Sequence, residues 1–129
     1  MNTQTLYLIR GLPGSGKTTL AHRIAPMVFS ADDYFVEEDG VYRYRPDAIK
    51  DAHESCYMHT RDVLAAGHRH VAVANTFSRR WEMGPYRGLA DAVVEISIET
   101  LLTDAELAAR CVHGVPVEKI AAMRARWEA

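Results

Sequence analysis

The chain has 129 residues, of which 48% are hydrophobic and 25% are charged, and its formal net charge is −2. This composition is ordinary for one globular domain, and the charge excludes a global basic field that would attract nucleic acid, although a local basic groove would be enough. No apolar run approaches the ~18–20 residues that span a membrane, and the N-terminus lacks a basic-then-apolar signal. We therefore expect a single domain over residues 1–129 that is cytoplasmic, monomeric and independent of membranes. Cys56 and Cys111 have no metal-type partner nearby in the sequence, and reduced thiols are the favoured interpretation.

The first predicted elements are a strand and a helix with a phosphate-binding loop between them. Residues 6–9 form an apolar run of buried-strand length, and residues 17–25 are typical of a helix. Between them, residues 11–18 have the sequence GLPGSGKT, which fits the G-x-x-x-x-G-K-[ST] pattern of nucleoside-triphosphate enzymes. A glycine turn with a chance lysine is the alternative, but it does not explain why strand, loop and helix follow in this order.

Each residue type in this loop has a physical role toward phosphate. The glycines let the backbone bend so that consecutive N–H groups point at an anion, at the N-terminus of the helix. Lys17 supplies a mobile charge for the β- and γ-phosphates, and the Thr18 hydroxyl can ligate Mg²⁺. The residues that we expect to bind the nucleotide are Gly11, Pro13, Gly14, Ser15, Gly16, Lys17, Thr18 and Thr19. The sequence therefore predicts a nucleoside triphosphate as ligand.

A second short strand, residues 27–30, is followed by two aspartates. Asp32 and Asp33 stand at its carboxyl end, which is the edge where ligands lie in open α/β sheets. Transfer of a phosphoryl group to a hydroxyl needs a nearby carboxylate to take the proton, and Asp32 is placed for that role. Asp32 is also our candidate metal ligand, together with Thr18. A helix cap or a loop-stabilising contact is the alternative, and it is favoured for Asp33.

The middle of the chain predicts a hairpin, a long helix and a third strand. Residues 35–45 are polar and carry an Asp-Gly turn signal, so we expect a small hairpin or flap over the site. Residues 46–66 predict a helix that begins at a proline and stops before a glycine, and residues 71–74 predict a buried strand.

The next segment predicts an interrupted helix and a fourth strand. Ser78 can cap a helix, which Gly84-Pro85 interrupts or kinks before a second piece over residues 86–92. Residues 93–98 predict the fourth strand. Strands that alternate with helices indicate an α/β fold with a parallel sheet and right-handed crossovers. Four arginines are candidates for a local basic groove, although ordinary solvated side chains are an equal alternative: these are Arg43, Arg45, Arg79 and Arg80.

Residues 101–129 predict a helical lid. A capping-box pattern at residues 103–106 begins one helix, and a second helix follows to the C-terminus. Such a pair can close over a nucleotide, with an arginine that neutralises charge on the transferred phosphoryl group. On a helical wheel Arg124 lies on the apolar face and is the sharper catalytic candidate, and Arg110 is a second one. Arg126 falls on the other face, where a solvated side chain is the favoured interpretation.

Motifs along nearly the whole chain carry a family resemblance. The matching segments are residues 11–18, 32–35, 41–46, 52–53, 75–76, 81–86 and 113–128. In these the chain resembles the small P-loop kinases grouped around the T-even phage polynucleotide 5′-hydroxyl kinase, and more closely the kinase-like module of the Nedd-four-binding protein family, which are AAA-type P-loop ATP-binding proteins. The resemblance implies a four-stranded parallel sheet in the order 2-3-1-4 with a C-terminal lid. It also implies ATP and Mg²⁺ on Lys17 and Thr18, Asp32 as general base, and lid arginines on the phosphates.

Two positions depart from the family pattern. Phe35 stands where the phage kinase has an arginine that holds the nucleic-acid acceptor, and Ala74-Asn75 stand where the third strand ends with an aspartate near the metal. The leading hypothesis is an ATP-dependent kinase whose acceptor is a hydroxyl on a nucleic-acid 5′ end. A small-molecule kinase of the zeta-toxin type, and a nucleotide-binding regulatory module with little catalysis, are the alternatives. A plain hydrolase is disfavoured because no water-positioning residue follows the third strand.

Overall fold

The computed structural model describes residues 3–129 and contains a four-stranded, fully parallel sheet. Strand β1 (Thr5–Arg10) lies between β3 (His70–Asn75) and β4 (Ala92–Ser97), and β2 (Met27–Phe29) pairs with β3. The order β2-β3-β1-β4 confirms the order that the family resemblance implied. No helix within residues 3–129 is both long and apolar enough to cross a bilayer.

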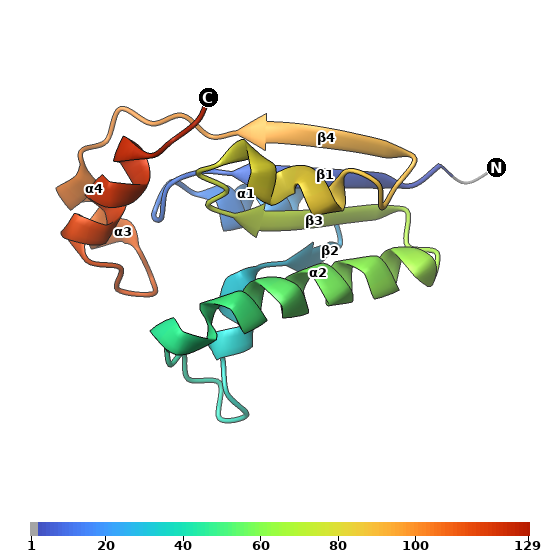
Figure 1. Cartoon of the computed structure of the whole chain (residues 1–129), viewed down its shortest axis with the longest axis horizontal. Coiled ribbons are helices and arrows are strands. Elements are labelled where there is room, and N and C mark those ends of the chain that lie inside the picture. Colours follow the sequence, from blue (N-terminus) through green and yellow to red (C-terminus); the bar gives the residue numbers. More distant parts are fainter. Residues whose placement is uncertain (1–2) are drawn as a thin grey trace.

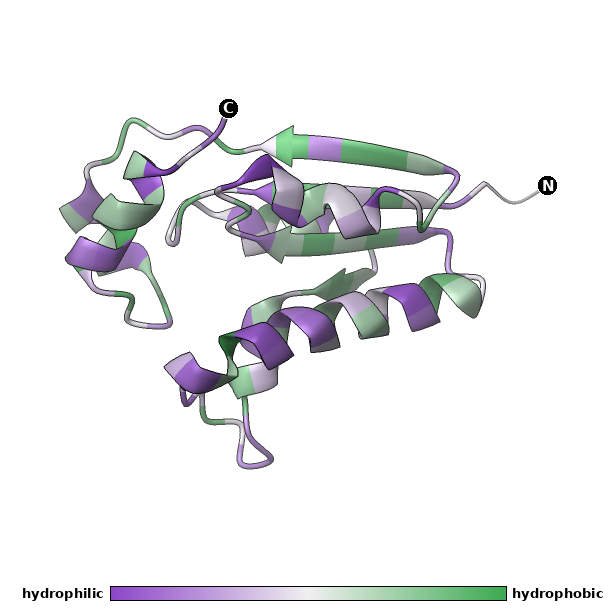
Figure 2. Ribbon diagram, viewed as in Figure 1, coloured by the Kyte–Doolittle hydropathy of each residue, from purple (hydrophilic) through white to green (hydrophobic). Residues whose placement is uncertain are grey.

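Helices cover both faces of the sheet, because successive side chains of a strand point to opposite faces. Helix α1 (Lys17–Ile24) covers one face, and α2 (Ile49–Ala65) with the 3₁₀ helix η3 (Arg80–Tyr86) covers the other (Figure 1). Figure 2 shows the hydrophobic residues concentrated on the strands, whereas α2 alternates between polar and apolar turns. The buried residues of the α1 side are Ile9, Ala21, Ala25, Ala72 and Ala74. Those of the α2 side are Leu6, Leu8, Cys56, Leu64, Val71, Val73, Phe77, Met83 and Tyr86.

Two short helices form the C-terminal part, beyond the carboxyl ends of the strands. Helices α3 (Asp104–Arg110) and α4 (Val117–Ala125) lie side by side there (Figure 1). Leu107 and Ile120, both fully buried, pack on Leu12 of the glycine-rich loop. The predicted lid therefore has a small core of its own, and that core includes a residue of the loop it covers.

The segment between β2 and α2 forms the predicted hairpin. The 3₁₀ helix η1 (Ala31–Phe35) leads into it, Val36 and Tyr42 form an antiparallel bridge, and η2 (Pro46–Ala48) leads on to α2. The turn lies at Asp39-Gly40, as expected, with Gly40 at a φ of 80°.

One predicted helix is wrong. Residues 87–91 form turns where a helix over 86–92 was expected, and Pro85 lies inside η3. A 3₁₀ helix has three residues per turn and is usually short, because its hydrogen-bond geometry is poor. Pro85 has no backbone N–H, so it lacks a donor that a continuing α-helix would need. Ser78 is not the cap of η3, because Arg79 occupies that position.

Candidate functional site

The glycine-rich loop has the geometry of an anion cradle. Gly14 and Gly16 have φ angles of 83° and 95°, a left-handed conformation that favours glycine. A Cβ on Gly14 would lie 2.4 Å from the backbone oxygen of Leu107, so only glycine allows the lid to approach this closely. Among the described residues, no atom apart from those of its chain neighbours and the helix backbone lies within 4 Å of a Cβ built on Gly16, the N-cap of α1. The Ser15 hydroxyl is buried and has no hydrogen-bond partner among the described residues.

Lys17 brings a partly buried positive charge to this cradle. Burial lowers the pKa of Lys17 from its ordinary value, and the neighbouring Asp32 carboxylate acts in the opposite direction. Both side chains line one pocket of about 600 Å³. A desolvated ammonium gains more from an arriving phosphate than an exposed one does, because the interaction is less screened.

The two aspartates after β2 have different contacts. Ser30 caps η1, with its hydroxyl accepting from the Asp32 amide, while the Asp33 carboxylate accepts from the Ser30 amide at 3.0 Å. Asp33 thus has the loop-stabilising contact that was the favoured interpretation. Asp32 is left to face the pocket, where the Tyr42 hydroxyl donates to its Oδ1 at 3.2 Å and the Nε2 of His113 lies 3.8 Å from its Oδ2.

Asn75, at the end of β3, fixes the turn that carries Asp32. Its Oδ1 accepts from the Ala31 amide at 2.8 Å, and its Nδ2 donates to the sulfur of Cys56 at 3.7 Å. Because both the oxygen and the nitrogen of its side-chain amide are hydrogen-bonded, Asn75 holds this edge of the sheet in place and brings no negative charge to it.

The lid arginines are not arranged as the helical wheel suggested. Arg124 donates to the Asp104 carboxylate and to the Leu102 carbonyl, at 2.7 and 2.9 Å, and it is not among the residues that line the pocket. Arg110 and Arg126 do line it, and Nε of Arg126 donates to the Ser78 hydroxyl at 2.9 Å. Arg124, on the apolar face of α4, therefore pairs with a carboxylate within the lid and not with a group in the pocket.

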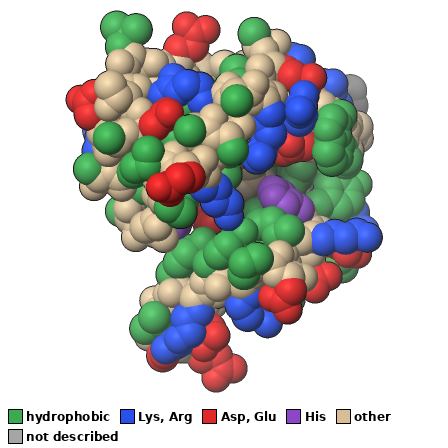
Figure 3. All heavy atoms as spheres, turned by 60° about the vertical axis from the view of Figure 1, so that its left-hand side comes forward, with side chains coloured by type: hydrophobic (Ala, Val, Ile, Leu, Met, Phe, Trp, Pro, Cys, Tyr) green, Lys and Arg blue, Asp and Glu red, His purple; other side chains and the backbone are tan. Residues whose placement is uncertain are grey.

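The pocket lies where the loop, the hairpin and the lid meet. Figure 3 shows a hollow seam between two parts of the molecule, with Lys, Arg and His side chains close to a band of hydrophobic ones. The predicted site residues that line the pocket are Pro13, Gly14, Gly16, Lys17, Thr18, Thr19, Asp32 and Arg110. The predicted residues outside its lining are Gly11, Ser15 and Arg124. The lining residues that the sequence did not predict include Tyr42, Tyr44, Ile49, His53, His113 and Lys119. A resemblance segment contained some of these, but no local pattern assigned them a function.

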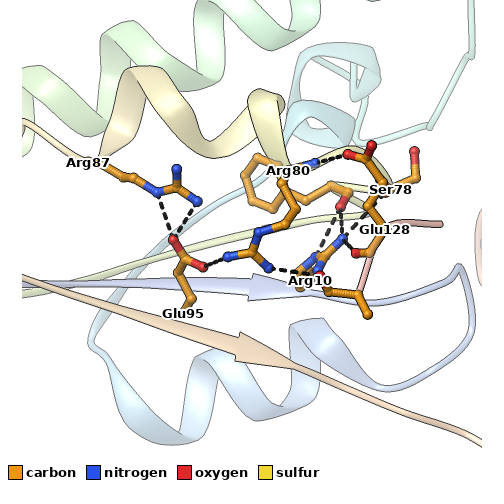
Figure 4. Close-up of polar contacts among 8 residues, drawn as sticks. Arg10, Ser78, Arg80, Arg87, Glu95 and Glu128 are labelled. Atoms are coloured by element: carbon orange, nitrogen blue, oxygen red, sulfur yellow. Dashed lines mark hydrogen bonds and ion pairs between the residues drawn. The ribbon is translucent and has the colours of Figure 1, made fainter.

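Arg10 is a further residue for which the sequence predicted no role. It ends β1 directly before the loop, is fully buried, and donates to the carbonyls of Phe77, Ser78 and Glu128. Its guanidinium also lies over the Trp127 ring, 4.2 Å from the ring centre. Figure 4 shows Arg10 beside Ser78 and Glu128, so that the end of β1, directly before the loop, is joined to the end of the lid.

The donors present suit a nucleoside triphosphate with a hard cation. Thr18 and Asp32 supply a hydroxyl and a carboxylate oxygen on the same pocket, the ligand type that Mg²⁺ prefers. Within residues 3–129 no three side chains of His, Cys, Asp and Glu gather closely enough to form a metal site of their own. The phosphates of the nucleotide would therefore have to supply part of the coordination, as is usual for Mg²⁺ with ATP.

Comparison with known proteins identifies similar sequences and folds. A family model described as "AAA domain" matches residues 6–128. NEDD4-binding protein 2 from Homo sapiens is 32% identical over 134 residues, which cover 95% of this chain but only 8% of that protein. A chain of the Pnkp1/Rnl/Hen1 RNA repair complex superposes with a TM-score of 0.72 and 19% identity, over 98% of this chain and 44% of that one. A gluconokinase from Sinorhizobium meliloti 1021 superposes with a TM-score of 0.65 and 14% identity, over 100% of this chain and 78% of that one.

Proposed function

Because the chain belongs to the AAA domain family and has a P-loop kinase-like fold, we propose that it transfers the γ-phosphate of ATP to a hydroxyl acceptor. We propose that residues 1–129 act as one kinase-like module in which residues 101–129 serve as the lid. The observation that carries the proposal is that Lys17 of the phosphate loop and the Asp32 carboxylate line the same pocket. A binding module would need the first of these groups, whereas phosphoryl transfer to a hydroxyl also needs the second.

The proposed reaction assigns a role to each group. Asp32 takes the proton of the acceptor hydroxyl, whose oxygen forms a bond to the γ-phosphorus while the bond from that phosphorus to the β,γ-bridging oxygen breaks. Lys17 and the loop amides hold the β- and γ-phosphates, and Mg²⁺ held by Thr18, beside the Asp32 carboxylate, would neutralise part of their charge. Arg110 and Arg126 are our candidates for the lid cation; Arg124, held by Asp104, is no longer one.

The first candidate acceptor is the 5′-hydroxyl of a polynucleotide. Support comes from the family resemblance and from the fold shared with a chain of an RNA repair complex.

A small hydroxyl compound is the second candidate, and the ion pairs of the surface arginines favour it. Arg43 pairs with Glu37 and Asp39, at 2.7 and 2.8 Å, so its charge is already neutralised within the hairpin. Arg79 and Arg80 likewise pair with acidic side chains. Three of the four arginines considered for a basic groove are therefore less available to a polynucleotide backbone. The fold shared with a gluconokinase agrees with such an acceptor.

Transfer of the labelled γ-phosphate of ATP tests the proposal. The wild-type chain and the Lys17→Met and Asp32→Asn variants would be incubated with Mg²⁺ and either 5′-hydroxyl DNA and RNA oligonucleotides or a panel of sugars and sugar acids. Asp51→Asn is the matched control, because Asp51 is exposed on α2 and lies outside the pocket lining. We expect transfer by the wild type and the control only.

The acceptor that becomes labelled decides between the two candidates. If ATP binds but no acceptor is labelled, the kinase proposal is wrong and the chain is a nucleotide-binding module. If Asp32→Asn keeps full activity, the base has been assigned to the wrong residue.

A further inference from the structure

The hairpin and the lid meet directly over Asp32. The Tyr42 hydroxyl donates to Oδ1 of Asp32 at 3.2 Å, and the Tyr42 ring stacks on the His113 ring with 4.1 Å between centroids and 27° between planes. Tyr42 comes from the hairpin, and His113 comes from the connection between α3 and α4. One tyrosine therefore contacts the proposed base through its hydroxyl and the lid through its ring.

A second contact of the same kind holds the hairpin against the lid. Lys119 of α4 donates to the Tyr44 hydroxyl at 2.7 Å and lies 4.1 Å from the centre of its ring. Tyr42 and Tyr44 are two residues apart in the hairpin, and both line the pocket. Beneath them the buried ring of Phe35 packs edge-on against both, at 6.0 and 5.1 Å between centroids. The Tyr42 ring is thus held from below by Phe35 and from the lid by His113.

Asp32 needs such support. Its side chain is 46% exposed on a 3₁₀ turn, and a carboxylate in that position can rotate among several rotamers. Its Oδ1 accepts from Tyr42, whereas Oδ2 has His113 at 3.8 Å, beyond hydrogen-bonding distance. Oδ2 is therefore the oxygen available for a proton. Burial, together with the Asp32 charge, raises the pKa of Tyr42, so the hydroxyl stays a donor at any physiological pH.

We propose that Tyr42 is a positioning residue for Asp32, and that His113 fixes Tyr42 by stacking, so that the proposed base is fully oriented only when hairpin and lid meet. This inference rests on the proposed phosphotransferase function. Tyr42 does not exchange a proton in the reaction. It holds Oδ1, and this leaves Oδ2 directed at the acceptor.

Single substitutions separate the hydroxyl of Tyr42 from its ring. Tyr42→Phe keeps the stacked ring and removes the donor, and we expect kcat to fall about tenfold while the Kd for ATP and the KM for the acceptor change less than about twofold. His113→Ala should lower kcat by a similar factor, and His113→Phe, which restores a stacked ring, should recover most of it. Tyr7→Phe is the matched control: Tyr7 also stacks on a histidine, His70, but lies outside the pocket.

The assay includes Asp32→Asn, so that failure of this inference differs from failure of the proposed function. If the wild type is active, Asp32→Asn is inactive and Tyr42→Phe equals the wild type, the kinase function stands and the positioning role is wrong. A loss of ATP affinity in Tyr42→Phe equal to its loss in kcat also overturns it, because Tyr42 would then act on nucleotide binding. If no acceptor is labelled by the wild type, the proposed function fails, and the positioning role fails with it.

Discussion

Arg10, the last residue of β1, donates a hydrogen bond to the backbone carbonyl of Glu128, 118 positions further along the chain. The Glu128 amide in turn donates to the Ser78 carbonyl at 2.8 Å. The end of β1 and the C-terminal tail are thereby joined beside the phosphate loop, and Arg126, two residues before Glu128, lines the pocket. The lid is therefore anchored at its C-terminal end as well as through Leu12.

Replacing Arg10 by methionine should destabilise the fold by about 2–3 kcal/mol, because the carbonyls of Phe77 and Glu128 would lose a charged donor in a buried place. Urea denaturation measures this loss. The hydrogen-exchange rate of the Glu128 amide should rise, because the C-terminal tail is released locally. Arg23→Met is the control, because Arg23 is exposed on α1, and it should change stability by less than about 0.5 kcal/mol. Equal stability of the two variants would contradict the anchoring role of Arg10.

Lys17→Met should abolish stabilisation by ATP while leaving the ligand-free protein as stable as the wild type or more stable. Burial lowers the pKa of Lys17, which means that the charged form is costly in the absence of a ligand. At 100 times the Kd, ATP should stabilise the wild type by about 2.7 kcal/mol, or roughly 10 °C in Tm. Thermal unfolding with and without ATP-Mg²⁺ tests this, with Lys50→Met on exposed α2 as control. If ATP raises the Tm of Lys17→Met as much as that of the wild type, the nucleotide binds somewhere other than this loop.

The two cysteines should react very differently with a thiol reagent. Cys111 is partly exposed and lines the pocket, whereas Cys56 is 3% exposed and burial raises the pKa of its thiol. At pH 8 one thiol should react quickly with Ellman's reagent, and the second only after unfolding. ATP at ten times its Kd should slow the fast thiol about tenfold. Cys111→Ser should remove the fast phase, and a fast phase insensitive to ATP would count against nucleotide in this pocket.

Glu95 should make stability depend on pH in the acid range. Burial by itself would raise the pKa of Glu95, but hydrogen bonds and charge from Arg87 and Arg80, at 2.7 and 2.6 Å, lower it below its ordinary value (Figure 4). A carboxyl with a lowered folded-state pKa stabilises the protein above its unfolded pKa of about 4.3, and loses this contribution as pH falls through the folded value.

Glu95→Gln should therefore be less stable than the wild type by about 1 kcal/mol at pH 7 and no less stable near pH 2–3, with a smaller difference at high salt. Glu38→Gln, at the exposed tip of the hairpin, is the control and should show no such trend. A difference that stays constant from pH 7 to pH 2 would rule out the ion pairs as its cause.

The elements that local patterns predicted well are those whose stability is decided within a few neighbouring residues. The strand, glycine loop and helix over residues 6–25 needed only apolar runs and glycines at fixed spacing, and the capping box at Thr103 appears with both of its hydrogen bonds. The strand order came from the family resemblance, since local patterns do not specify which strands pair. The helix expected over 86–92 failed because the turns after Pro85 have no pattern that separates them from a helical end.

By itself, then, the sequence determined the phosphate loop, the carboxylates after β2 and the parallel α/β class, because these depend on residues adjacent in the chain. Only the tertiary structure decided that Arg126, and not Arg124, reaches the pocket in addition to Arg110. Helix α4 ends at Ala125, so Arg126 lies beyond the helix and a helical wheel does not predict the direction of its side chain. Arg124 instead forms an ion pair with Asp104, which lies 20 residues earlier in the chain. Tyr42, His113 and Arg10 have their partners across the fold, and contacts of that range are set by how the elements pack rather than by local spacing.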